Sequence, residues 1–152
     1  MNHHLVSRSG MRFGNRKGGA AVELAVVFPL LLLLIVGVVD YGRVFYTSVT
    51  VANAARAGAE YGATVPNKSQ NATEMRQQAL ADGGEAGAIT IATRTYCRCG
   101  GATAGCGSFC GSGAAPEVYV EVTATKVVTM LLRYPGLPNS ITVSRKALFQ
   151  AQ

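Results

Sequence analysis

The stretch GGAAVELAVVFPLLLLLIVGVVDYGRVFYTSVTVANAARAGAEYG, residues 18–62, decides the architecture of this chain. Residues 24–39 carry no charge, and extending the run back to Ala20 leaves Glu23 as its single charged residue. An apolar helix of about 20 residues crosses the roughly 30 Å hydrocarbon core of a bilayer. A helix on a soluble core keeps a polar stripe, which this run lacks. The sequence therefore predicts a membrane-spanning helix.

The charges that precede the apolar run are all basic. Residues 1–18 contain no acidic residue and four basic ones, Arg8, Arg12, Arg16 and Lys17. An excess of Lys and Arg marks the cytoplasmic side of a membrane helix. We therefore expect residues 1–18 to be a basic cytoplasmic leader and the C-terminal part to lie outside the membrane. The net charge of +6 does not indicate nucleic-acid binding, because no basic cluster remains elsewhere in the chain.

A cleaved secretory signal is the alternative for such an N-terminus. The apolar run is longer than the 7–15 residues usual for a signal peptide. Asp40 and Arg43 follow it at the i,i+3 spacing of a helical ion pair. No small-x-small cleavage site lies directly after the run, and Ala52-Asn53-Ala54, which has that form, is too far downstream. Retention of the helix is favoured.

Glu23 lies about one turn inside the apolar run, where an ionised carboxylate is costly unless it is paired or interfacial. One interpretation is a side chain that simply sits at headgroup level. Its context favours another, because Arg16-Lys17-Gly18 precedes it and Glu23 is the fifth residue after that glycine. This spacing resembles the leader of type IV pilins and pseudopilins, which a prepilin peptidase cuts after the glycine.

The whole segment from Arg16 to Ala63 is similar to the TadE-like family of tight-adherence pilus systems. The similarity rests on four features: small residues before Val-Glu, a Pro-Leu tract, an acidic-aromatic-Gly-Arg exit, and an Ala-Ala-Arg-x-Gly-Ala helix. Two positions depart from the family pattern. Gly19 occupies the first mature position, where Ala is more familiar, and Leu24 follows the glutamate, where Phe or Tyr is common.

The resemblance implies a pseudopilin, a structural or assembly subunit of a tight-adherence, Flp-type pilus, with Gly18, Gly19 and Glu23 as its processing residues. Its implied partners are a prepilin peptidase, an inner-membrane platform with its ATPase, and the major pilin or other pseudopilins. Its implied location is the bacterial inner membrane, crossed once. The alternative is a single-span, membrane-anchored binding module that never enters a filament.

Beyond the span we expect the helix to continue, so that residues 19–62 form a transmembrane and stalk helix. Gly62 and Pro66 supply its stop. Small residues recur at helical spacing and form a smooth face that allows close packing: Ala52, Ala55, Ala59 and Gly62. This face suits packing on the protein's own domain or between helices of a filament, and both interpretations stay open.

The remaining residues, 63–152, predict a small extracytoplasmic domain. Asn71-Ala-Thr-Glu74 has the form of a capping box and predicts a short helix from Ala72 to about Ala81. Strands are predicted where apolar and polar residues alternate, at 88–97, at 117–124 and, more weakly, at 141–149. Residues 129–133 fit either a strand or a helical turn. The expected fold class is α+β, a long N-terminal transmembrane helix extending into a domain with an antiparallel sheet.

Four cysteines, Cys97, Cys99, Cys106 and Cys110, define a Gly/Ser/Ala-rich loop expected at 97–110. Their spacing is not that of a zinc ribbon, although a zinc site made by all four thiolates stays open as an alternative. Outside the membrane, disulfides are favoured, and they would staple a glycine-rich loop. Four cysteines allow three pairings. A nested closure of Cys97 with Cys110 and Cys99 with Cys106 fits the flanking antiparallel strands best.

Residues for catalysis are scarce. His3 and His4 are the only histidines and lie in the proposed leader, so the mature domain would have no imidazole for acid–base chemistry. Glu117 and Glu121 share one face of a predicted strand, where we expect them to be solvated. We therefore expect no enzyme activity, no cofactor and no metal site.

Overall fold

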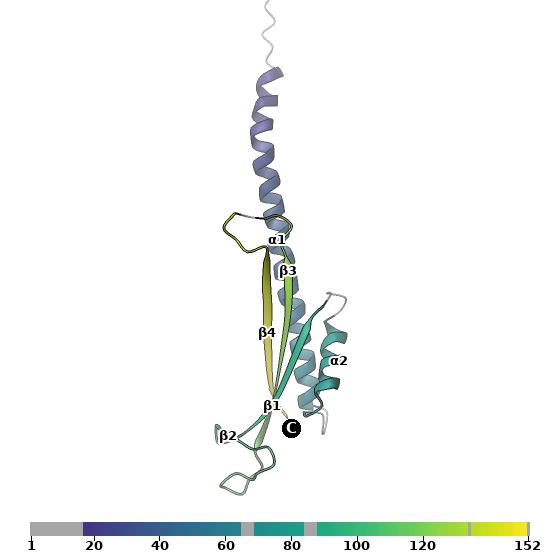
Figure 1. The fold of residues 1–152 in the computed structure, drawn as a ribbon, viewed down its shortest axis with the longest axis vertical. Coiled ribbons are helices and arrows are strands. Elements are labelled where there is room, and N and C mark those ends of the chain that lie inside the picture. The colour runs from purple at the N-terminus through teal and green to yellow at the C-terminus, as the bar shows by residue number, and fades with distance from the viewer. Residues whose placement is uncertain (1–16, 65–68, 84–87, 134, 152) are drawn as a thin grey trace, which may run out of the picture. The chain divides into compact units, whose positions relative to one another are not determined.

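The computed structural model describes residues 17–64, 69–83, 88–133 and 135–151. They form an apolar N-terminal helix followed by a short helix and a small antiparallel sheet, which confirms the predicted α+β class (Figure 1). The elements, in chain order, are α1 (Lys17–Thr64), α2 (Ala72–Asp82), β1 (Thr90–Cys99), β2 (Ala102–Ala104), β3 (Glu117–Thr129) and β4 (Ser140–Gln150).

Two compact units divide the chain within α1. One ends at Gly37, and the other comprises Val38–Gln152. The second unit contains the last part of α1, together with α2 and the whole sheet, and it holds the hydrophobic core.

The core of the second unit lies between a helical layer and one face of the sheet. Small and branched side chains of α1 and α2 meet valines and alanines of the strands there, because small residues let a helix backbone approach a sheet closely. The buried cluster consists of Val51, Ala54, Ala55, Ala59, Met75, Ala79, Ile91, Val120, Val122 and Ala124.

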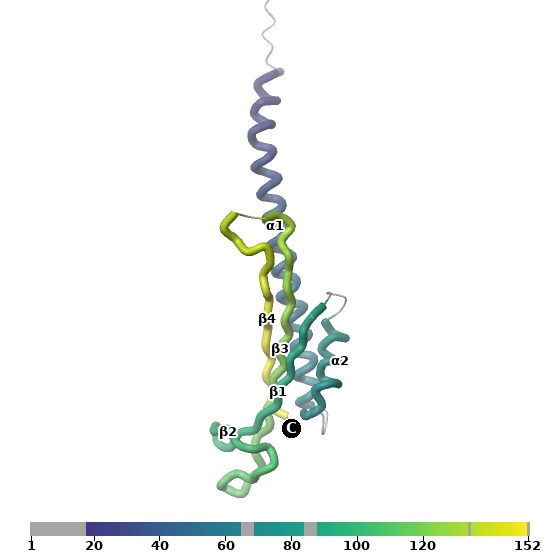
Figure 2. The backbone as a smooth tube through the Cα atoms, viewed as in Figure 1, coloured from purple at the N-terminus to yellow at the C-terminus, as the bar shows by residue number. Residues whose placement is uncertain are grey.

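The sheet is antiparallel throughout, with strand order β2-β1-β3-β4. β3 buries Val120, Val122 and Ala124, so the predicted alternation and its buried face are confirmed. The tube in Figure 2 follows the chain from β1 into the short β2 and then to β3 at that same end of the sheet. β2 was not predicted, because three residues in a glycine-rich segment carry no detectable alternation.

The predicted cap forms at the start of α2, with Asn71 as its N-cap residue. Asn71 Oδ1 accepts from the backbone N of Glu74 at 3.2 Å, and Asn71 Nδ2 donates to Glu74 Oε1 at 2.7 Å. The helix ends at Asp82, where Gly83 N donates to Ala79 O at 2.9 Å. Glu74 Oε2 also accepts from the Tyr61 hydroxyl at 2.6 Å, which ties α2 to α1.

Several predicted boundaries differ from the structure; β1, for example, is shifted by two residues, to 90–99 from the predicted 88–97. α1 ends at Thr64 rather than at Gly62, and Pro66 lies outside the described residues. β3 ends at Thr129, and residues 130–133 form neither a strand nor a helix. The reason is that Leu131 is held by a side chain of α1, as described below, rather than by a neighbouring strand.

Candidate functional site

The residues predicted for processing lie in the first two turns of α1. Gly18, Gly19 and Glu23 are all exposed, and a Cβ built on either glycine meets no atom within 4 Å. Gly19 and Glu23 are four residues apart, so they lie on the same face of the helix. The rest of the predicted leader, residues 1–16, lies outside the described residues.

The apolar run is exposed along its length. Thirteen large hydrophobic side chains between Val22 and Val39 have 42–72% of their surface exposed. Soluble monomers rarely expose a contiguous apolar surface of this extent. Within the described part of the chain, α1 is the one helix long and apolar enough to cross a bilayer. This exposed N-terminal helix suggests membrane anchoring.

Asp40 and Arg43, directly after the apolar run, join α1 to the connection between β3 and β4. Asp40 is only 4% exposed, and its Oδ1 and Oδ2 accept from Leu131 N at 3.0 and 3.2 Å. Arg43 Nη1 lies 3.6 Å from Asp40 Oδ1 and donates to Thr129 O at 3.3 Å. A buried carboxylate needs such partners, because desolvating an unpaired charge is costly. The sequence carries no signal for the contact with Leu131, which is 91 residues away.

The smooth face of α1 packs on the protein's own domain. Ala55 and Ala59 are 1% and 0% exposed, respectively. A Cβ on Gly58 would lie 2.9 Å from both Met75 O and Ala79 Cβ, so α2 approaches α1 as closely as a glycine allows. Of the two interpretations left open by the sequence, the structure supports packing within the domain for these residues. Other faces of α1 remain available for filament contacts.

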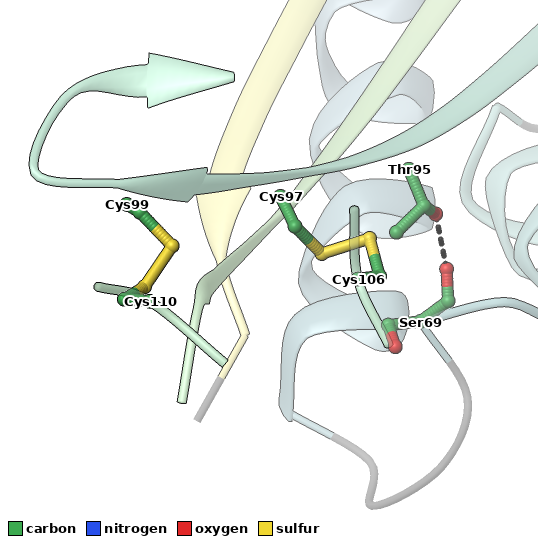
Figure 3. The surroundings of a disulfide bond; sticks show 6 residues. All are labelled: Ser69, Thr95, Cys97, Cys99, Cys106 and Cys110. Carbon is green, nitrogen blue, oxygen red and sulfur yellow. Dashed lines mark hydrogen bonds between the residues drawn. A yellow bond between two sulfur atoms is a disulfide. The ribbon is translucent and has the colours of Figure 1, made fainter. Parts of the chain in front are cut away.

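All four cysteines form disulfides near the end of β1 (Figure 3). Cys97 bonds to Cys106 and Cys99 to Cys110, with Cα–Cα distances of 5.1 and 5.5 Å. The nested pairing predicted from the sequence, Cys97–Cys110 with Cys99–Cys106, is therefore wrong. The zinc alternative also fails, because no thiolate is left to bind a metal.

The pairing differs because the chain first folds back on β1 to form β2, whereas the prediction assumed a single loop closure between β1 and β3. Gly100 and Gly101, with φ of 55° and 89°, turn the chain immediately after β1, so β2 runs back beside it. Cys106 follows β2 and thereby reaches Cys97. The segment between β2 and β3 then brings Cys110 to Cys99, the last residue of β1. Both N-terminal cysteines thus belong to the strand and not to the loop.

The disulfide end of the sheet is also tied to the segment before α2. Cys97 is fully buried. Two residues earlier on the same face of β1, the Thr95 hydroxyl donates to the Ser69 carbonyl oxygen (Figure 3). The core cluster contains no residue between 97 and 117, so the two bridges help to hold this segment on β1.

The opposite face of the sheet carries an aromatic and charged cluster. The rings of Tyr96 and Tyr119 stack with centroids 5.6 Å apart, and the Arg98 guanidinium lies 5.4 and 5.7 Å from them. The Tyr119 hydroxyl donates to Glu117 Oε2 at 3.0 Å. This hydrogen bond is the main cause that raises the pKa of Tyr119 above its ordinary value of 10.0.

The two carboxylates expected to be solvated on this face are both engaged by neighbours. Glu121 Oε2 accepts from Lys146 Nζ at 3.2 Å, and Glu117 is held by a tyrosine as described. In residues 17–64, 69–83, 88–133 and 135–151, no group of three His, Cys, Asp or Glu side chains has the arrangement of a metal site.

Comparison with known proteins bears on the N-terminal part of the chain. A family model described as TadE-like protein matches residues 18–60. Comparison with curated proteins gave no match, and comparison with solved structures gave none either. The matched segment begins at Gly18 and includes the apolar run, the exit residues Asp40 and Arg43, and the start of the packed face of α1. The match confirms the resemblance and supports a pseudopilin family associated with the Tad pilus. Residues 18–60 of α1 are therefore similar to the TadE-like family, as the sequence predicted.

Proposed function

We propose that this protein is a pseudopilin that serves as a structural or assembly subunit of a tight-adherence pilus. A prepilin peptidase cuts the leader after Gly18, and the mature protein begins at Gly19. The apolar run holds the protein in the bacterial inner membrane, with residues 1–18 in the cytoplasm and the sheet domain outside. The role is structural rather than catalytic.

The match of the TadE-like model to residues 18–60 is the observation that carries this proposal. It begins at the glycine that would precede the cut. The accessible backbone at Gly18 and Gly19 supports it further, because a peptidase needs an unobstructed chain at the scissile bond. The two disulfides support a domain outside the cytoplasm, where thiols are not kept reduced.

Glu23 has a physical role in this scheme. Cleavage frees an amine on Gly19, four residues away on the same helix face. At the bilayer boundary, that amine and Glu23 of the same or a neighbouring subunit neutralise each other, because either charge alone is costly there. The pairing would recruit the subunit to other pilins. The partners of this scheme are the peptidase, the inner-membrane platform with its ATPase, and the major pilin or other pseudopilins.

The test replaces Glu23 by glutamine and uses Glu60→Gln as the matched control, since Glu60 is an exposed acid farther along the same helix. Glu23→Gln is expected to insert and to begin at Gly19 by N-terminal sequencing, because removing a charge makes insertion easier. It is expected to be lost from sheared filaments and from co-purification with the major pilin, whereas Glu60→Gln behaves as wild type.

Other outcomes would favour the alternative of a membrane-anchored binding module. One such outcome is a wild-type protein that still starts at Met1 in the presence of the peptidase. Another is a wild-type protein that never appears in sheared filaments. Normal piliation by Glu23→Gln would show that the carboxylate is only interfacial. Gly18→Leu provides the reference for an uncut chain, because a side chain beside the scissile bond blocks processing.

A further inference from the structure

The connection between β3 and β4, described for residues 130–133 and 135–139, exposes apolar side chains that the fold does not cover. Leu131, Leu132 and Leu137 are 57%, 44% and 65% exposed, and none belongs to the core cluster. Connecting loops face water and are rich in polar residues. A group of leucines in such a loop therefore indicates a surface that contacts something apolar.

This loop is held in place. Met130 N donates to Asn139 O at 2.9 Å and closes its base, and Gly136, with φ of 83°, turns the chain within it. At its start, Leu131 N donates to the buried Asp40 carboxylate. The leucines consequently project from an anchored segment.

Asp40, which accepts the hydrogen bond from Leu131 N, fixes where the loop lies along the helix axis relative to the end of the apolar run. Val38 and Val39, the last residues of that run, belong to the same compact unit as the loop. Asp40 is covalently next to Val39, and a helix advances about 1.5 Å per residue. When the apolar run fills the hydrocarbon core, Asp40 and the loop bound to it lie at the boundary of that core.

Aromatic side chains on α1 mark the same boundary independently. Tyr41, Phe45 and Tyr46 are 74%, 62% and 71% exposed in the two turns after Val39. Tyrosine is enriched where a membrane helix leaves the hydrocarbon, because its ring is apolar and its hydroxyl is polar. At about 1.5 Å per residue these rings extend roughly 10 Å beyond the apolar run, which is of the order of the headgroup zone.

Basic side chains accompany the leucines. The Arg43 side chain, 45% exposed, donates to the carbonyl that precedes the loop, and Arg133 within the loop is exposed. Apolar side chains beside exposed cations form the pattern that binds the interface of an anionic membrane.

We propose that the β3–β4 loop is a second membrane contact, in which Leu131, Leu132 and Leu137 enter the headgroup–acyl boundary of the leaflet where the span emerges. This proposal rests on the membrane placement in the proposed function. Its consequence is that the second unit contacts the bilayer through this loop as well as through the end of the apolar run.

The absence of tryptophan from the chain allows a site-specific test. A single tryptophan is introduced by Leu132→Trp in the loop, by Leu34→Trp in the span, or by Phe109→Trp as a control. Phe109 lies in the disulfide loop at the other end of the sheet and is 79% exposed. Each full-length variant is reconstituted in vesicles of phosphatidylcholine and phosphatidylglycerol whose acyl chains are brominated either near the headgroup or near the methyl end.

Leu132→Trp is expected to emit at shorter wavelength than Phe109→Trp and to lose most of its emission with lipid brominated near the headgroup. Phe109→Trp should be quenched by aqueous iodide and not by brominated lipid. If Leu132→Trp behaves like Phe109→Trp, the loop does not touch lipid and the proposal is wrong. A blue-shifted Leu132→Trp that no brominated lipid quenches also overturns it, because a protein surface then covers the loop.

The Leu34→Trp variant, with its tryptophan in the apolar run, distinguishes a loop that does not touch lipid from a chain that does not span the membrane. Leu34→Trp quenched by lipid brominated near the methyl end shows that the run crosses the bilayer, whatever the loop does. If Leu34→Trp is not quenched, the membrane placement itself is wrong.

Discussion

Replacing Gly58 by alanine is expected to destabilise the second unit, although alanine is the better helix former. The new Cβ would lie 2.9 Å from Met75 O, 2.9 Å from Ala79 Cβ and 3.3 Å from Val122 Cγ1. The two closest atoms are a backbone oxygen and a Cβ of α2, which no side-chain rotation can move. α2 must therefore shift away from α1, and the packing beneath it must loosen.

The size of the effect follows from two opposing terms. Alanine in place of glycine favours a helix interior by about 1 kcal/mol. Overpacking of a close-packed core costs about 1–3 kcal/mol. The net loss expected for Gly58→Ala is thus about 0–2 kcal/mol in the free energy of unfolding. Gly42, on the same helix, has no atom within 4 Å of a built Cβ and is exposed, so Gly42→Ala should gain up to about 1 kcal/mol from propensity alone.

The assay is denaturant unfolding of the full chain in detergent micelles with the disulfides oxidised, followed by circular dichroism. Identical substitutions on one helix should move the midpoint in opposite directions. The double variant Gly58→Ala/Ala79→Gly removes one of the two closest atoms, so its loss should be smaller than the sum of the two single losses. Equal stabilisation by Gly42→Ala and Gly58→Ala would refute the close contact between α1 and α2.

Four further predictions concern the sheet and its loops. Cleavage of the oxidised protein after Arg98 and Phe109 should leave three fragments joined by two disulfides, whereas the nested pairing would release the middle fragment. Reduction should lower the stability by roughly 2.5–3 kcal/mol for each bridge if its loop entropy is the main term. The phenol of Tyr119 should ionise above its ordinary pKa of 10.0 in an ultraviolet absorbance titration, and Glu117→Gln should move that pKa down. Because the folded pKa is raised, the stabilising hydrogen bond is complete below pH 10.0 and is lost as pH rises through the folded pKa. Asp40→Ala should leave the loop amide without its acceptor, cost about 1–3 kcal/mol and speed hydrogen exchange at that amide.

Features encoded within a few neighbouring residues were predictable. The N-cap of α2 needs only Asn71 and Glu74, and the predicted hydrogen bond from Glu74 N to Asn71 Oδ1 is present. The buried face of β3 follows from a period of two over a single segment. The apolar helix follows from one uninterrupted run, and its match to the TadE-like model covers the same residues.

Features that depend on distant partners were not predictable. Asp40 looked like the polar end of a span, and its acceptor role depends on an amide 91 residues away. The disulfide pairing depends on a chain reversal at Gly100 and Gly101 that precedes a strand of only three residues. The periodicity of small residues on α1 could not show which element packs on them. The structure places α2 against α1 at Gly58, so packing within the domain accounts for this part of the helix.

Asp40 has two roles in the proposed membrane arrangement, and different substitutions can separate them. As the first charge after the apolar run it ends the membrane-spanning sequence, since a carboxylate is costly in hydrocarbon. As a buried acceptor it also holds the loop whose leucines we assign to the membrane surface. Asp40→Asn keeps an amide oxygen for the loop but removes the charge, whereas Asp40→Leu removes both and extends the uncharged run to Gly42. If the loop contact depends on the hydrogen bond, lipid quenching of the Leu132→Trp reporter should survive Asp40→Asn and fall with Asp40→Leu. Equal loss in both variants would mean that the charge, through its ion pair with Arg43, sets the loop position.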